Sequence, residues 1–142
     1  FKDTVKAERV ERINTILGSV NTKRTTTMQA NLEKMTAIVS RLETKLTELE
    51  SEGKDTSSAK LAIASAKTAI ETAKTALTAQ VAKDYTIAIT SESTVKTDAA
   101  TMRTSLHTDL QTVHQLVVTA RQAVAKAISE TKSLLGKVED GE

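Results

Sequence analysis

Residues 28–49 have the sequence MQANLEKMTAIVSRLETKLTEL. Their apolar side chains recur at alternating intervals of four and three residues: Met28, Leu32, Met35, Val39, Leu42, Leu46 and Leu49. This spacing keeps one apolar seam on one side of a helix for several turns, and it is typical of helices that pack along their length as coiled coils. We therefore predict a long helix that packs against other helices.

The same pattern begins earlier in the chain and weakens once. An apolar seam at Val10, Ile13, Leu17 and Val20 is followed by the mainly polar residues 21–27. No Gly or Pro interrupts residues 21–27, so we expect a stutter in a continuous helix, with a real bend at this point as the alternative. The first helix is expected to span about residues 3–52 and to stop at Gly53, because glycine tolerates the left-handed conformation of a helix C-cap.

Two further helices are predicted. A tight hairpin follows Gly53, because Asp55, Thr56 or Ser57 can accept hydrogen bonds from the first amides of the next helix. The second helix covers about residues 56–89, and the third about 97–135 after a polar turn. Alanine alternates with larger residues along the second seam: Ala59, Ile63, Ala66, Ile70, Ala73 and Leu77.

The unequal helix lengths indicate an architecture. At about 1.5 Å per residue, the first helix is roughly 75 Å long and the second roughly 50 Å. We predict an all-α fold, an elongated three-helix antiparallel coiled-coil-like bundle, in which residues 1–142 form one domain and the long first helix partly projects. Residues 1–20 would project as an assembly segment covered by a second copy or another protein; alternatively, the third helix lies far enough along to cover most of them. The predicted interaction residues are Phe1, Val10, Ile13, Leu17 and Val20.

Composition limits the classes of function. The chain has no Pro, no Cys, one Phe, one Tyr and a net charge of +2. So few aromatic residues leave little surface on which bases could stack, and charges of both signs are interspersed, so we expect no nucleic-acid partner. No stretch has the roughly 18 consecutive apolar residues of a transmembrane helix, so we expect no membrane span.

No catalytic, cofactor-binding or metal-binding residues are predicted. His107 and His114 are seven residues apart, which separates them by roughly 10 Å along a helix, too far for one metal ion. The four glycines stand alone and form no phosphate-binding loop. Carboxylate pairs such as Glu43 and Glu48 would lie on an exposed face, without a pocket to change their pKa. We therefore expect neither an enzyme nor a cofactor.

Residues 41–46, RLETKL, are followed by EGKDTSSA at 52–59 and by a helix rich in Ala and Lys. Over residues 28–135 this arrangement resembles a loose group of predicted exported helical proteins from uncultivated bacteria. The resemblance implies export and an all-helical fold, and no particular activity. Threonine on helix faces where Glu, Lys and Gln would be better helix formers also favours an extracytoplasmic location, as do the lack of Cys and the start at Phe1. A removed leader and a fragment both remain open.

These observations lead to one expected function and one alternative. We expect an extracytoplasmic structural or interaction protein, secreted or at the cell surface, that self-associates as a homo-oligomer or as a filament or surface-appendage subunit. The seam of residues 1–20 of one copy would dock on the next copy, and such a contact propagates unless the ring closes. The alternative is a non-catalytic helical-bundle binding module, either a ligand sensor or a lipid-surface binder.

Overall fold

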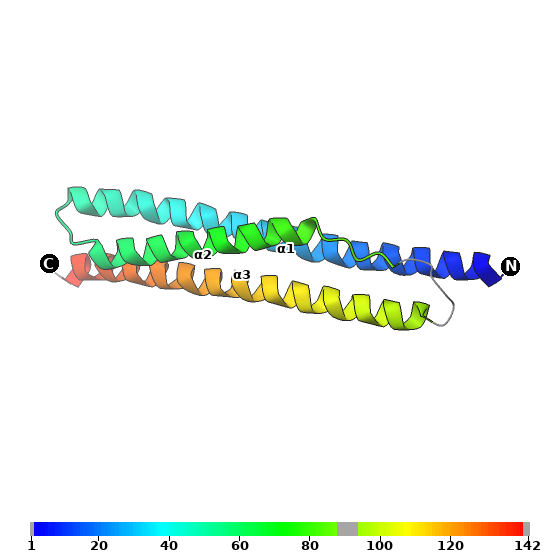
Figure 1. Cartoon of the computed structure of the whole chain (residues 1–142). Coiled ribbons are helices and arrows are strands. Elements are labelled where there is room, and N and C mark those ends of the chain that lie inside the picture. The colour runs from blue at the N-terminus through cyan, green and yellow to red at the C-terminus, as the bar shows by residue number, and fades with distance from the viewer. Residues whose placement is uncertain (1, 88–93, 141–142) are drawn as a thin grey trace.

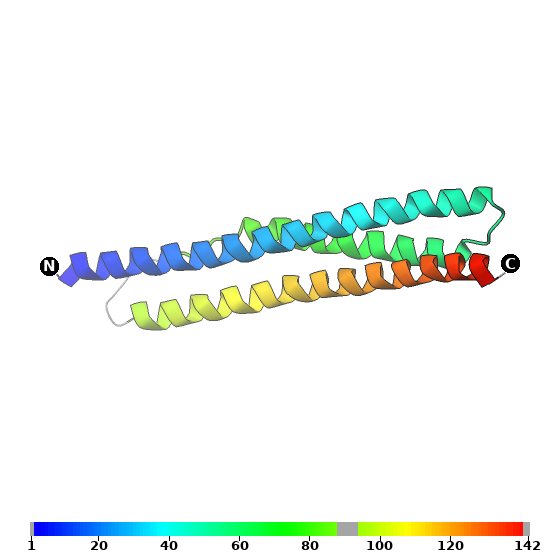
Figure 2. The same cartoon turned by 180° about the vertical axis from the view of Figure 1, so that it is seen from behind.

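The protein folds as a bundle of three helices. The computed structural model describes the backbone of residues 2–87 and 94–140 and the side chains of 4–87 and 94–135, and this part of the chain contains no strand. The helices are α1 (Lys2–Ser51), α2 (Ser57–Val81) and α3 (Val95–Asp140). Each packs against the other two, with α1 and α3 running in one direction and α2 in the opposite one (Figure 1, Figure 2). The predicted all-α, three-helix bundle is confirmed.

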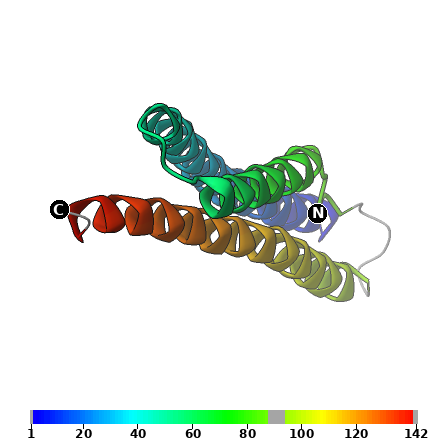
Figure 3. The ribbon, with the colours of Figure 1, turned by 90° about the vertical axis from the view of Figure 1, so that its left-hand side faces the viewer.

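The core is built from one apolar seam of each helix. Leu32 of α1, Ala66 of α2 and Ala120 of α3 are completely buried. The alanines of α2 allow the helices to approach closely, because a small side chain leaves room for the ridges of the neighbouring helix. Seen from the end where α1 finishes, the three helices lie at the corners of a triangle rather than in one layer (Figure 3).

The hairpin between α1 and α2 forms as the sequence predicts. Gly53 has a φ of 84°, its amide donates to the carbonyl of Glu50 at 2.9 Å, and the amide of Lys54 donates to the carbonyl of Leu49 at 3.0 Å. These two bonds form a Schellman motif, which satisfies carbonyls that the end of α1 would leave without partners. Thr56 is the N-cap residue of α2 and makes no side-chain capping bond, but Oδ1 of the preceding Asp55 accepts from the amide of Ser57 at 3.1 Å.

The predicted stutter in α1 is also present. The helix continues without interruption through residues 21–27. Asn21 and Thr25 are buried, so they continue the seam between Leu17 and Met28 with polar side chains. From Ile13 to Thr25 the seam advances by four residues three times in succession, and the alternation of three and four resumes at Met28. Such a stutter lets a straight helix keep the same side toward its partners.

The predicted end of the second helix, at residue 89, is wrong. Helix α2 ends at Val81, and residues 83–87, which we call the strap, continue along α1 without helical structure (Figure 1). Side chains supply the hydrogen bonds that a further helical turn would have made. Oδ1 of Asp84 accepts from the amide of Thr86 at 2.9 Å, and Asn14 bonds both backbone groups of Ile87. Residues 88 and 89 lie outside the described residues.

Helix α3 is longer than predicted at both ends. It begins at Val95, within the expected turn, and its backbone remains helical to Asp140 instead of ending near 135. The beginning of α3 therefore lies beside the first part of α1, and only the first turns of α1 extend past it (Figure 1). This corrects the predicted projecting segment: α3 and the strap cover most of the seam of residues 1–20, as the alternative arrangement proposed.

Candidate functional site

The predicted assembly seam is divided between the core and the surface. Val10 and Leu17 are buried, 3% and 4% exposed, and Ile13 is half-buried against the same core. Val10 packs with Ile87 of the strap and with Val95 and Ala99 of α3. These three seam residues are therefore part of the intramolecular core and cannot form the joint between copies that the sequence suggested. Val20 remains 38% exposed, and Phe1 lies outside the described residues.

A different side of the same stretch of α1 carries exposed apolar residues. Val5 is 46% exposed and Ile16 is 54% exposed. Eleven residues, about three helical turns, separate them, so they share one side of α1, and Val20 follows Ile16 by about one turn. We call Val5, Glu8, Arg12, Ile16 and Val20 the outer α1 face.

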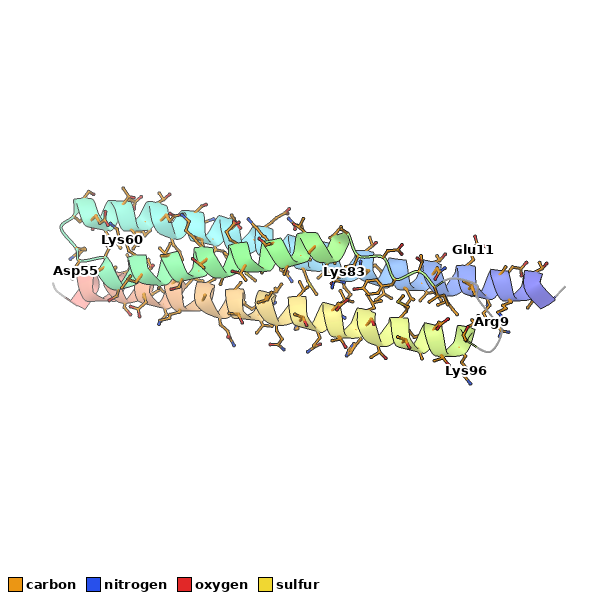
Figure 4. All side chains as sticks on the ribbon, in the orientation of Figure 1. Arg9, Glu11, Asp55, Lys60, Lys83 and Lys96 are labelled. Atoms are coloured by element: carbon orange, nitrogen blue, oxygen red, sulfur yellow. The ribbon has the colours of Figure 1, made fainter. Side chains whose placement is uncertain are left out.

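Charged residues occupy the centre of the outer α1 face. Glu8 and Arg12 are both exposed, and neither forms an ion pair with any described residue. They are four residues apart and so lie side by side on the helix surface. Arg9 and Glu11 point toward opposite edges of α1 (Figure 4). With 3.6 residues per turn, the directions of Glu8 and Arg12 fall between those of Arg9 and Glu11.

The second notable feature is a chain of polar side chains at the end of α2. Asn21 and Gln80 bond each other directly, because Nε2 of Gln80 donates to Oδ1 of Asn21 at 2.9 Å, while Nδ2 of Asn21 donates to the Gln80 carbonyl at 3.1 Å. Nε2 of Gln80 also donates to the hydroxyl of Tyr85 at 2.7 Å, and that hydroxyl donates to Oδ2 of Asp109 at 2.6 Å. Nζ of Lys83 lies 3.2 Å from the same carboxylate oxygen. We call these five residues the polar layer.

The polar layer shifts the acidity of two of its members. Burial raises the pKa of Tyr85 to about 12, and the bond that its hydroxyl donates to Asp109 adds to this effect. The Tyr85 hydroxyl, followed by Lys83, holds the pKa of Asp109 below its usual range. Both shifts favour the protonation states in which a neutral tyrosine donates to a charged carboxylate, so the layer is stable as a unit at neutral pH.

The hydrogen bonding of the polar layer is complete, and this indicates that the layer has a structural role. Within the described part of the chain, every buried side-chain nitrogen and oxygen has a hydrogen-bond partner. The buried members of the layer, Asn21, Gln80 and Tyr85, disfavour other alignments of the helices, because any shift would leave buried polar groups unpaired. The layer therefore fixes where α2 ends and where the strap begins.

Asn14 holds the other end of the strap. Its Oδ1 accepts from the amide of Ile87 at 2.8 Å, and its Nδ2 donates to the Ile87 carbonyl at 3.3 Å. One amide side chain thus pairs with both backbone groups of one strap residue, much as a neighbouring strand would. The apolar side chain of Ile87 can then pack on Val10 while its backbone remains satisfied.

The spacing of apolar residues in the sequence did not reveal Asn14, Asn21, Gln80 or Asp109. A signal for two of them was present. Asn21 follows Leu17 by four residues, and Gln80 follows Leu77 by three, so both occupy seam positions where an apolar residue is expected. A polar residue at a seam position often specifies the alignment of packed helices.

Other candidate sites receive little support. His107 is exposed and His114 is half-buried on α3, and no group of three or more His, Cys, Asp or Glu side chains in the described residues could hold a metal ion. The grooves along the bundle are open to solvent; one lies between α1 and the strap and is lined by Ala7, Glu11 and Asn14 among others. None of the described helices has the length and apolar character needed to cross a membrane.

The chain was compared with protein families, curated proteins and solved structures. No protein-family model matches the chain, and no curated protein and no solved structure matches it either.

Proposed function

We propose that this chain is an extracytoplasmic structural or interaction protein that self-associates, in the form of a filament or surface-appendage subunit. The observation that carries the proposal is the outer α1 face. Val5, Ile16 and Val20 remain substantially exposed on the first part of α1, whereas the large apolar residues in the rest of α1 are buried or half-buried. Exposed apolar side chains that line one side of a helix, here on both sides of a charged centre, favour contact with another protein.

The revised contact differs from the seam that the sequence suggested. Val10 and Leu17 are already buried within the chain, so association through them would require unfolding of this end of the bundle. The outer α1 face is available without any rearrangement. Association through it leaves the core and the polar layer intact.

The exposed threonines support the proposed location outside the cytoplasm. Thr44, Thr72 and Thr104 are exposed, and each hydroxyl donates to the carbonyl four residues earlier. Threonine is a weaker helix former than Glu, Lys or Gln, so its use at such positions indicates selection for an uncharged polar surface rather than for helix stability. Secreted and cell-surface proteins provide a setting for such a surface.

The test is the mass of the purified chain, measured by light scattering over a range of concentrations together with negative-stain imaging. We expect ordered oligomers or filaments whose mass rises with concentration. A monomer at every concentration would contradict self-association and would leave the binding module, a ligand sensor or lipid-surface binder, as the better explanation.

A double variant tests the face itself. Val5→Ser with Ile16→Ser removes two half-exposed side chains, each worth about 1 kcal/mol if the contact buries its exposed part. Four side chains are lost from a symmetric pair, so association should weaken roughly a thousandfold. The matched control is Leu61→Ser, which removes an even more exposed apolar side chain, 72% exposed, from α2. The control should associate like the wild type.

A further inference from the structure

The outer α1 face has an order of side chains that is complementary to itself. From residue 5 to residue 16 it presents apolar Val5, acidic Glu8, basic Arg12 and apolar Ile16, and Val20 lies beyond this self-complementary part. Reversing the direction of the helix exchanges the two apolar residues and places each charge at the position of the opposite one. A face of this kind fits a second copy of itself that runs in the opposite direction.

The pairing can be specified from the spacing. When two α1 helices lie antiparallel, facing positions have residue numbers with a constant sum, and a sum of about 20 places Glu8 of one copy against Arg12 of the other. Two-fold symmetry repeats this pair with the copies exchanged. At the same alignment Val5 lies against Thr15, beside Ile16 of the second copy. A parallel alignment in register would instead oppose Glu8 to Glu8 and Arg12 to Arg12.

We propose that two copies of this chain pair antiparallel through their outer α1 faces, centred near residue 10, with reciprocal contacts between Glu8 and Arg12. This pairing rests on the proposed function, self-association, and specifies the contact through which two copies would associate. Both charged groups are exposed and lack ion-pair partners among the described residues, so pairing would not break an existing ion pair. Such a pair is closed by its symmetry, and growth into a filament would require a second contact outside this face.

The charges of the face favour this occupant over others. Arg9 and Arg12 are balanced by Glu8 and Glu11, and with Lys6 residues 5–20 carry a net charge of only +1, which gives little attraction for an acidic lipid surface or a polyanion. Alternating charges of both signs are instead what two copies of one helix need in order to define their alignment.

Charge exchange tests the pairing. The variants Glu8→Arg and Arg12→Glu each place like charges opposite one another in a pair of identical chains, so each should associate roughly tenfold to a hundredfold more weakly than the wild type. An equimolar mixture of the two variants restores both complementary contacts, because one chain then carries two basic and the other two acidic residues. Sedimentation velocity should show that the mixture associates like the wild type.

The mixture also separates the contact between chains from effects within one helix. Glu8 and Arg12 are neighbours on the same helix, and both variants lose that local attraction. Mixing cannot restore it, so recovery of association can only arise between chains. Circular dichroism of each variant should show unchanged helix content, since both positions are exposed.

A distance measurement tests the orientation with the native charges in place, so it holds even if an exchanged variant folds poorly. The chain has no cysteine, so Lys23→Cys provides a single attachment point for a spin label at an exposed position beyond the contact. The antiparallel pair places the two labels roughly 39 Å apart along the helix axis, whereas a parallel pair in register places them side by side.

The outcomes distinguish the pairing from the proposed function. Associated wild type with weakened variants, a recovering mixture and a long label distance supports the antiparallel pair. If the wild type associates but the mixture of variants does not, or if the labels lie close together, the antiparallel pair is wrong while self-association stands. A wild type that stays monomeric at every concentration contradicts both the antiparallel pair and self-association.

Discussion

The pKa of Tyr85 provides the sharpest test of the polar layer. It is the only tyrosine in the chain, so its ionisation can be followed by the ultraviolet absorbance of tyrosinate without interference from other residues. The structure raises this pKa to about 12 from an ordinary value of 10.0, chiefly by burial. In the folded chain the absorbance should therefore rise with a midpoint near pH 12, whereas the denatured chain should titrate near pH 10.

The same shift predicts how stability depends on pH. Because the pKa is higher in the folded chain than in the unfolded one, the contribution of Tyr85 is fully present below about pH 10 and is lost as the pH rises to about 12. The difference between the two values corresponds to about 3 kcal/mol of unfolding free energy. Urea unfolding at several pH values measures this loss, and Tyr85→Phe serves as the control because it has no group that ionises.

Two further variants sharpen the result. Asp109→Asn should lower the midpoint of Tyr85 only in part, because burial is the larger cause of its shift and the bond to Asp109 the smaller. Lys83 also pairs with the Asp109 carboxylate, so Lys83→Met separates its effect on Asp109 from that of the tyrosine. A midpoint near pH 10 in the folded wild type would refute the burial of Tyr85 in the polar layer, whatever the behaviour of these variants.

Two other predictions concern the first part of α1. Asn14→Ala should lower the unfolding free energy by about 1–3 kcal/mol, because it leaves both backbone groups of Ile87 without their partner. Urea unfolding measures this loss. The control is Asn31→Ala, which removes a half-buried amide from the same helix and should change stability by less than about 1 kcal/mol. Equal losses in these two variants would contradict the role of Asn14. Leu17→Ser should cost about 2–5 kcal/mol because it replaces a buried side chain, and Val20→Ser should cost less than half as much; if Leu17→Ser leaves thermal unfolding unchanged, the placement of Leu17 in the core is wrong.

The apolar pattern of the sequence was sufficient to predict the helices and the hairpin. The regular seam of α1 and the capping glycine at Gly53 both act locally, so their structure follows from nearby residues alone. The end of α2 could not be predicted in this way. Ile87 is buried as expected, but burial does not specify a helical backbone, and here the backbone follows the side chains of Asn14 and Tyr85 instead.

The polar layer was missed for a related reason. An analysis of apolar spacing treats Asn21 as an interruption of the seam, although the helix and its buried side both continue through it. Its partner Gln80 is distant in the sequence and meets it only after the helices have packed, and the same holds for Asp109 and its partner Tyr85. The outer α1 face likewise became visible only when the fold showed which apolar residues the strap and α3 leave uncovered.

The short length of α2 divides the rod into two parts that should open separately. Along most of its length three helices enclose the core, but beside the first part of α1 the third wall is the strap, held by Asn14 and the polar layer (Figure 1). Segments that bury less apolar surface open at a lower free energy than the whole domain, and such openings are the ones that proteases detect first. Cleavage under native conditions should therefore begin in the strap, while the section around α2 remains folded. The end of the rod that carries the outer α1 face is also the end that a binding partner could remodel at the lowest cost.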